Sequence, residues 1–78
     1  MSHIEFQTTA DAVYELEPQA RRIRKTGGKT STGGRIVRTW STYARILGPV
    51  LGQPVIVQWP DGHYTATRAV WCIVSPPD

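Results

Sequence analysis

Residues 55–74 read VIVQWPDGHYTATRAVWCIV, two runs of β-branched and aromatic residues separated by Pro60-Asp61-Gly62. Val, Ile, Thr, Tyr and Trp favour extended strands, whereas Pro-Asp-Gly favours a tight turn. The segment therefore predicts a β-hairpin, and the rest of the chain is interpreted around it.

The register of this hairpin depends on the length of its loop. Pro60 fixes φ at the second turn position, and a left-handed Gly62 completes a three-residue loop that pairs Trp59 with His63. Binary patterning instead favours a two-residue Asp61-Gly62 loop, which places on one face Val55, Val57, Trp59, Tyr64, Ala66, Val70, Cys72 and Val74. We expect the three-residue loop because Pro60 sets its conformation in advance, and a bulge near Arg68 would restore the alternation.

Within the hairpin, residues 57–66 resemble the strand-turn-strand of small SH3-like and Tudor-type barrels. The resemblance rests on a Trp, an Asp-Gly turn and a Tyr-x-Ala in succession, here Trp59, Asp61-Gly62 and Tyr64-Thr65-Ala66. Tyr64 stands one place closer to the glycine than in the Tudor pattern. No aromatic-cage residue is assigned from this short match.

The N-terminal third has two interpretations. Ile4-Glu5-Phe6 alternates as a short strand, and a helical stripe then follows from Thr9, formed by Val13, Leu16, Ala20 and Ile23. Pro18 disfavours helical geometry at the preceding residue, so we expect a kink or a break there. The competing interpretation makes residues 12–17 a strand.

A second helical stripe is predicted in the middle of the chain, where Ile36, Trp40, Tyr43 and Leu47 recur at spacings of three and four. Gly48-Pro49 is a typical helix stop. Because Val37, Thr39 and Thr42 favour strands, the first half of this segment is expected to be extended and residues 41–47 helical.

Together these elements predict one small α+β domain over residues 1–78. It comprises an antiparallel sheet built on the hairpin, one or two short helices, a flexible basic Gly-rich loop at 26–34 and a frayed tail at 75–78. The alternative is an all-β, SH3-like barrel, favoured if residues 12–17 and 35–42 are strands.

The distribution of charge is the main indication of function. The formal net charge is +3, but eight of the nine Lys and Arg residues lie between Arg21 and Arg45, and no Asp or Glu occurs between Glu17 and Asp61. Such a local field attracts anionic partners. The leading hypothesis is therefore a non-enzymatic binding protein that contacts nucleic-acid phosphate or a nucleoprotein surface.

In this hypothesis the basic residues hold the nucleic-acid backbone and an aromatic residue contributes a stacking surface. Trp59, at the mouth of the hairpin, is expected to be partly exposed. The expected site residues are Arg21, Arg22, Arg24, Lys25, Lys29, Arg35, Arg38 and Trp59.

Two further hypotheses concern protein partners. The first is a small inhibitor or adaptor that docks on an acidic protein surface or on a nucleic-acid-handling complex, as phage and plasmid proteins that block restriction or CRISPR systems do. The second is a homodimer in which the acidic N-terminal segment of one copy covers the basic middle of the other.

Several classes of protein are disfavoured. Gly28-Lys29-Thr30 lacks the earlier glycine of a nucleotide-binding P-loop, since Ile23 stands at that position. The two histidines and Cys72 fit no catalytic or metal-ligand spacing, so neither enzyme activity nor a cofactor is expected. No apolar run approaches the roughly 20 residues of a membrane span, and no signal peptide is recognisable. We expect a cytoplasmic protein.

Overall fold

The computed structural model describes residues 3–28 and 35–74. Every regular element in these ranges is a strand: β1 (Ile4–Thr8), β2 (Val13–Glu17), β3 (Arg22–Gly27), β4 (Ser41–Thr42), β5 (Arg45–Leu47), β6 (Pro54–Gln58) and β7 (Tyr64–Val74). They form a single antiparallel sheet in the order β4-β3-β2-β1-β7-β6-β5. The expected α+β fold is therefore wrong, and the all-β alternative fits.

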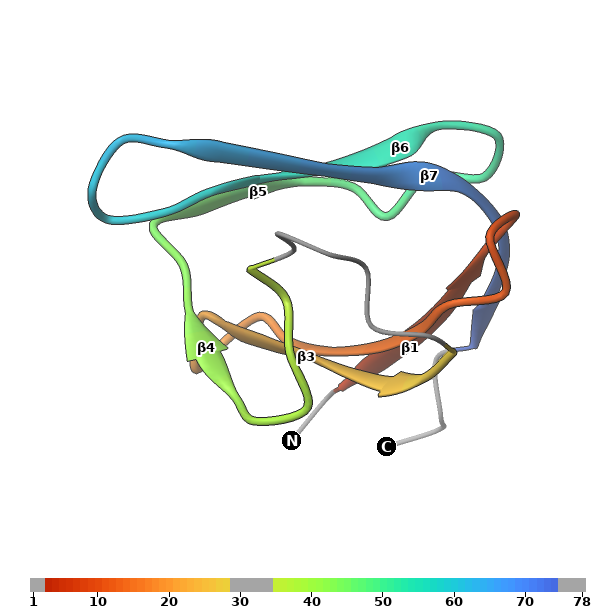
Figure 1. Ribbon diagram of the computed structural model, residues 1–78, viewed down its shortest axis with the longest axis horizontal. Helices are drawn as coiled ribbons and strands as arrows, with labels where there is room; N and C mark the ends of the chain where they lie inside the picture. The colour runs from red at the N-terminus through yellow and green to blue at the C-terminus, as the bar shows by residue number, and fades with distance from the viewer. Residues whose placement is uncertain (1–2, 29–34, 75–78) are drawn as a thin grey trace.

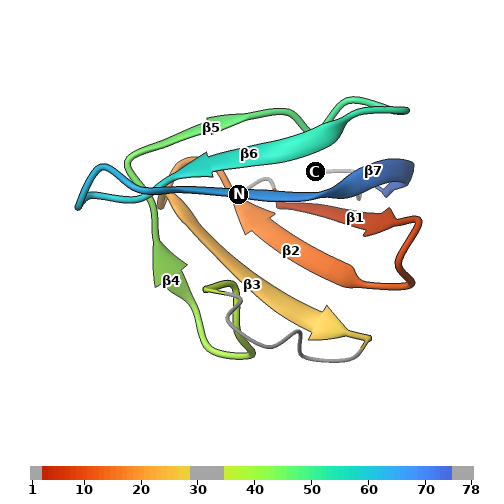
Figure 2. The same ribbon diagram turned by 45° about the horizontal axis from the view of Figure 1, so that its top comes forward.

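The sheet curls into a half-barrel because β7 takes part in two pairings. Its first half pairs with β6 and its second half pairs with β1, with a register shift in each ladder. Figure 1 shows β7 running along the upper layer and then bending towards β1 in the lower layer. In the turned view, β1, β2 and β3 fan out beneath β5 and β6 (Figure 2).

The two ends of the sheet are joined by the chain itself between β4 and β5. The backbone N–H of Tyr43 donates to the carbonyl oxygen of Arg21 at 2.9 Å, and that of Ala44 donates to Gln58 at 2.8 Å. These bonds tie the β2–β3 turn to β6, so they hold the curl of the sheet.

The core fills the concave side of the sheet. Phe6, Ile23, Val55 and Val57 are each 0% exposed, and the inward positions of β2 and β7 add Leu16 and Val70. Successive residues of a strand point to opposite faces, so in these strands buried residues alternate with partly exposed ones. The outer face of β1, β2 and β3 carries mostly polar and charged residues, together with Val13.

The first expected helix is replaced by β2, a turn and β3, which confirms the competing strand interpretation of residues 12–17. Leu16 points inward, and its neighbours Glu15 and Glu17 point outward. Pro18 opens the turn, whose last residue, Arg21, has a φ of 51°. The helical spacing gave a wrong prediction because its residues do not share one face: Val13, the first residue of that stripe, points outward on a strand.

The second expected helix is also wrong. Ser41–Thr42 and Arg45–Leu47 are short strands, and residues 35–40 lie outside any strand. Ile36 and Tyr43 are buried, whereas Leu47 is 69% exposed, so the apparent stripe is not one face. Gly48 precedes a cis peptide bond to Pro49 rather than capping a helix.

The hairpin and the first strand are confirmed. The N–H of Trp59 donates to the carbonyl of His63 at 2.8 Å, and Gly62 has a φ of 92°, so the loop has three residues. The register shifts by one residue between Pro54 and Ile56, which places a bulge in β7 close to Arg68. Of the expected loop at 26–34, Thr26 and Gly27 end β3; residues 29–34 and the tail at 75–78 lie outside the described residues.

Candidate functional site

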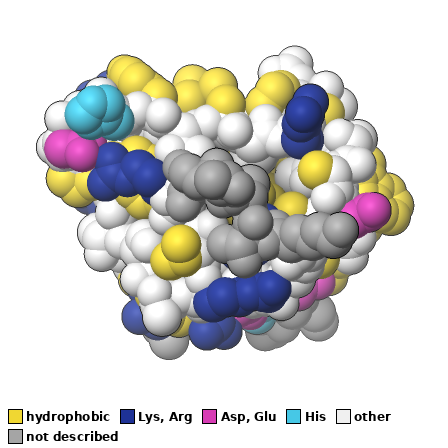
Figure 3. Space-filling model, viewed as in Figure 1, with side chains coloured by type: hydrophobic (Ala, Val, Ile, Leu, Met, Phe, Trp, Pro, Cys, Tyr) yellow, Lys and Arg dark blue, Asp and Glu magenta, His cyan; other side chains and the backbone are white. Residues whose placement is uncertain are grey.

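The structure divides the expected basic cluster among several places. On the face shown in Figure 3, the Lys and Arg side chains stand in separate groups, and one group adjoins an acidic side chain. Alternation along β3 is one cause: it sends Arg22 and Arg24 to the outer face and Lys25 to the inner face. No single surface therefore collects the described members of the cluster.

Arg22 and Arg24 are neutralised by the chain's own carboxylates. Their pairing partners in β2 are Glu17 and Glu15, and the shortest N–O distances are 2.7 Å for Arg22 with Glu17 and 2.6 Å for Arg24 with Glu15. Both guanidinium groups also lie 4.5 Å from the ring centroid of Trp40. Trp40 is thus covered by arginines rather than open to a base.

Lys25 lies inside the half-barrel and is 5% exposed. Its Nζ is 5.9 Å from the ring centroid of Tyr14, and its backbone N–H donates to Val37. It is therefore not part of an outer phosphate-binding surface. Lys29, the centre of the predicted loop, lies outside the described residues.

Arg35 and Trp59 meet at the tip of the hairpin. The Arg35 guanidinium is 2.9 Å from Asp61 and 4.8 Å from the ring centroid of Trp59. Trp59 is 2% exposed, and its Nε1 donates to Thr65 at 2.7 Å. The expected partial exposure of Trp59 is wrong, because the three-residue loop turns its ring into the core.

Asp61 is held as a carboxylate at this tip. The backbone N–H of His63 and the guanidinium of Arg35 lower the pKa of Asp61 from about 3.8 to about 2, because both donate to the charged form. Arg38 lies apart from this group and donates to the carbonyl oxygen of Gly28 at 2.8 Å.

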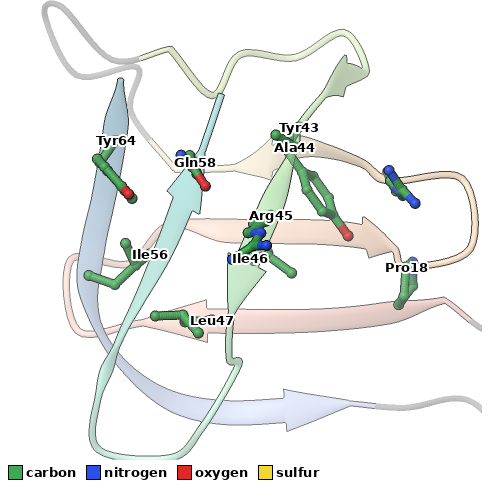
Figure 4. Close-up of a pocket in the computed structure, with 10 residues that line it drawn as sticks. Pro18, Tyr43, Ala44, Arg45, Ile46, Leu47, Ile56, Gln58 and Tyr64 are labelled. Carbon is green, nitrogen blue, oxygen red and sulfur yellow. The ribbon is translucent and has the colours of Figure 1, made fainter. Parts of the chain in front are cut away.

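A different group of residues forms an open groove of about 710 Å³ beside the edge strand β5, which we call the β5 groove. It is lined by Pro18, Arg21, Tyr43, Ala44, Arg45, Ile46, Leu47, Ile56, Gln58 and Tyr64. In Figure 4, Tyr64, Ile56 and Leu47 lie on one side of Arg45, and Pro18 lies on the other. The groove thus runs from the outer face of β5 and β6 to the turn between β2 and β3.

The β5 groove combines positive charge with apolar surface. Arg21 and Arg45 contribute two guanidinium groups, and none of the lining residues within 3–28 and 35–74 is acidic. Leu47 and Tyr64 are 69% and 67% exposed. Burial raises the pKa of the Tyr43 hydroxyl, opposed by Arg21, so the hydroxyl stays protonated.

Of the expected site residues that the structure describes, only Arg21 lies in this groove. The sequence interpretation missed Arg45 and Leu47 as site residues because it assigned residues 41–47 to a helix. Three residues are too few to display the alternation of a strand. One useful signal in the sequence for this site was the single charge of Arg45, which stands between the apolar pairs Tyr43-Ala44 and Ile46-Leu47.

Comparison with protein-family models, with curated proteins and with solved structures gave no match. Among the described residues, no group of three or more His, Cys, Asp or Glu side chains is placed to hold a metal ion. The described ranges also contain no helix long and apolar enough to cross a membrane.

Proposed function

We propose that this chain is a non-enzymatic binding protein that docks through the β5 groove on an acidic surface of another protein. The observation that carries the proposal is the composition of the groove: exposed aliphatic and aromatic side chains flanked by Arg21 and Arg45, with no carboxylate among the described residues of its lining. Protein interfaces commonly surround apolar anchors with charged residues, and arginine is enriched in them.

The aliphatic residues favour a protein partner over nucleic acid. Covering Leu47 and Ile56 with apolar groups of a partner stabilises the complex by roughly 25 cal/mol for each Å² of apolar surface removed from water. A phosphate backbone offers little apolar surface for this purpose. Arg22, Arg24 and Arg35, which the phosphate hypothesis requires, are already paired with Glu17, Glu15 and Asp61.

An inhibitor or adaptor works in this way, by covering a surface of another protein. The groove sets the chemistry of that surface: carboxylates placed to meet two guanidinium groups, with apolar side chains between them. We place this action in the cytoplasm, where a lone thiol such as Cys72 stays reduced. Small proteins of mobile genetic elements that block restriction or CRISPR complexes are one class with this mode of action.

Contact with nucleic-acid phosphate is the second candidate. It is favoured by one feature of the same groove, the exposed ring of Tyr64 beside Gln58 and near Arg45. An unpaired base stacks on such a ring while a guanidinium meets the backbone. Both candidate functions use the same arginines, so variants of these arginines do not distinguish the two functions, and different ligands are needed as probes.

Three probes distinguish these candidates: a short peptide of alternating Glu and Leu, the same peptide with Gln in place of Glu, and a single-stranded oligothymidine. Binding is measured by NMR titration of the labelled protein at low and moderate salt. We expect the Glu peptide to bind most tightly and to shift the resonances of β5 and Tyr64. The double variant Arg21→Gln/Arg45→Gln should weaken that binding about tenfold or more, since it removes two charge-assisted contacts.

The control is Arg38→Gln/Arg68→Gln, which removes the same charge from outside the groove. Loss of binding in the control as large as in the groove variant would mean that net charge alone attracts the peptide, and the groove would be rejected. Preferential binding of oligothymidine would replace the first candidate by the second. If neither the Glu peptide nor the oligonucleotide binds, both candidates fail.

A further inference from the structure

The outer edge of β5 lies along the β5 groove. β5 is the last strand of the sheet, and among the described strands it pairs with β6 alone. All three of its residues line the groove. In Figure 4, Gln58 of β6 lies on one side of Arg45, and Pro18 lies across the groove on the other side. One edge of this strand therefore faces the groove instead of another strand.

The hydrogen bonds of β6 show which of its backbone groups point towards β5. The N–H groups of Val55 and Trp59 donate to the second arm of the hairpin. The carbonyl oxygen of Gln58 instead accepts from the N–H of Ala44, on the side of β5. Successive residues of a strand direct their backbone groups to opposite sides, so Ile56 also points towards β5.

Ile46 is consequently the residue of β5 whose backbone faces the groove. Arg45 and Leu47 stand opposite Gln58 and Ile56, so their N–H and C=O groups are directed to β6. The N–H and C=O of Ile46 then point away from β6, into the groove that this residue lines. A strand edge that offers such a pair of groups is a template for a further strand.

The side chains of β5 add a pattern of charge and apolar surface to this edge. Ile46 packs inward against the core, whereas the exposed Arg45 and Leu47 lie two residues apart on the outer face. Arg21 brings a second guanidinium group from the turn between β2 and β3, and the described lining includes no carboxylate. A strand added here meets a cation and an aliphatic side chain on one face.

From this arrangement we infer that an extended segment of the partner protein adds to β5 as a further antiparallel strand. The inference rests on the docking function proposed above and specifies what the groove binds. One partner residue exchanges two hydrogen bonds with Ile46, and its two neighbours face Arg45 and Leu47. Antiparallel pairing sets the earlier neighbour opposite Leu47 and the later one opposite Arg45. The segment therefore reads apolar residue, any residue, then Asp or Glu.

A second copy of this chain fits the edge less well than an acidic segment does. Its own β5 would bring another Arg45, and residues 18–60 contain no Asp or Glu. The added strand is also short, because Pro49 follows β5 closely and has no N–H to extend the pairing. Two backbone bonds stabilise a complex only modestly, so the side chains opposite Arg45 and Leu47 must supply the rest.

N-methylated peptides test the backbone pairing by NMR titration of the labelled protein. The probe is the capped peptide Thr-Leu-Thr-Glu-Thr, whose central Thr is placed to pair with Ile46. N-methylation of the central Thr removes the N–H that donates to the Ile46 carbonyl, so it should weaken binding about tenfold or more. N-methylation of the Glu is the matched control. Its N–H points away from β5, and binding should change little.

A reversed peptide tests the order of the side chains. Thr-Glu-Thr-Leu-Thr has the same composition, but antiparallel pairing would set its Glu opposite Leu47 and its Leu opposite Arg45. It should bind about fivefold more weakly than the first peptide.

Amide hydrogen exchange provides a measurement on the unmodified protein. Saturation with Thr-Leu-Thr-Glu-Thr should slow the exchange of the Ile46 amide about tenfold, because its N–H gains an acceptor. The amides of Arg45 and Leu47 are directed to β6 with or without peptide, so they serve as the internal reference.

Each of three results would overturn strand addition: equal binding of the two N-methylated peptides, equal binding of the reversed peptide, or unchanged exchange at Ile46. Docking through the groove would still stand, because Arg21→Gln/Arg45→Gln judges that function with its own probes. Binding of the alternating Glu and Leu peptide without binding of Thr-Leu-Thr-Glu-Thr would likewise reject strand addition alone. If neither peptide binds, both proposals fail.

Discussion

Trp40 contacts two guanidinium groups at once, those of Arg22 and Arg24, each 4.5 Å from its ring centroid. The same two arginines form ion pairs with Glu17 and Glu15. The sequence hypothesis assigned Arg22 and Arg24 to nucleic-acid phosphate. In the fold these residues satisfy one another, because the pairing of β2 with β3 places acid beside arginine and the segment before β4 places the indole of Trp40 against both guanidinium groups.

Asp61 provides a test of electrostatics at the scale of a single residue. Its pKa is lowered to about 2, so its charged form stabilises the folded state fully above the unfolded pKa of about 3.8. That contribution is lost as the pH falls through about 2. We expect Asp61→Asn to lower the melting temperature at pH 7, because Arg35 loses its partner while the amide oxygen still accepts from His63.

Melting curves of the parent protein and of Asp61→Asn, recorded from pH 7 to pH 2, check this expectation. The two melting temperatures should converge between pH 4 and pH 2. A constant difference across that range would mean that the substitution acts through loop geometry rather than through charge.

At the scale of elements, the hairpin depends on the backbone of one residue. Gly62 has a φ of 92°, and a Cβ built there meets no atom within 4 Å. Gly62→Ala should therefore destabilise the protein through backbone strain alone, by about 1 kcal/mol. Gly62→Asn should lose less, since Asn tolerates the left-handed region better than Ala.

Urea unfolding of the parent protein and of both variants measures these differences. Equal losses for Ala and Asn would point to an effect of side-chain size rather than of φ. A loss near zero for Gly62→Ala would show that the loop can adopt another turn type.

Patterns of a few neighbouring residues correctly predicted the elements whose conformation those residues determine by themselves. Pro60 and Gly62 set the hairpin loop, and the alternation of Ile4-Glu5-Phe6 marks the first strand. The helical stripes failed because Val13, Leu16 and Ile23 satisfy a helical spacing by coincidence, whereas their strands are stabilised by cross-strand pairs such as Glu15 with Arg24. Glu15 and Arg24 are nine residues apart, and their pairing depends on where the turn between β2 and β3 lies, which the spacing of apolar residues does not reveal.

The same reason explains what was missed in the candidate site. Arg21 and Arg45 meet in one groove only because the curl of the sheet brings the β2–β3 turn to the edge strand β5. The number of charges could be counted from the sequence. To predict which of these charges lie on the inner face, on the outer face or at the hairpin tip, the register of each strand must be known.

For the whole molecule, intrachain pairing determines how much of the net charge of +3 can act on a partner. The acidic N-terminal segment covers the basic β3 within one chain, which is the compensation that the homodimer hypothesis assigned to a second copy. Glu15→Gln/Glu17→Gln would release Arg22 and Arg24 on the outer face. We expect this variant to bind single-stranded oligothymidine more tightly than the parent protein, with a steeper salt dependence.

The size of this effect follows from counterion release. Each new phosphate contact should add about −0.7 to the slope of log K against log salt, so two released arginines should add about twice that amount. Glu5→Gln/Asp11→Asn is the matched control, since it also raises the formal net charge from +3 to +5 but leaves both ion pairs intact. If the control gains as much affinity and slope as Glu15→Gln/Glu17→Gln, total charge governs nucleic-acid binding and the internal pairs do not mask the arginines. A gain confined to Glu15→Gln/Glu17→Gln means that the fold itself keeps these two cations from phosphate.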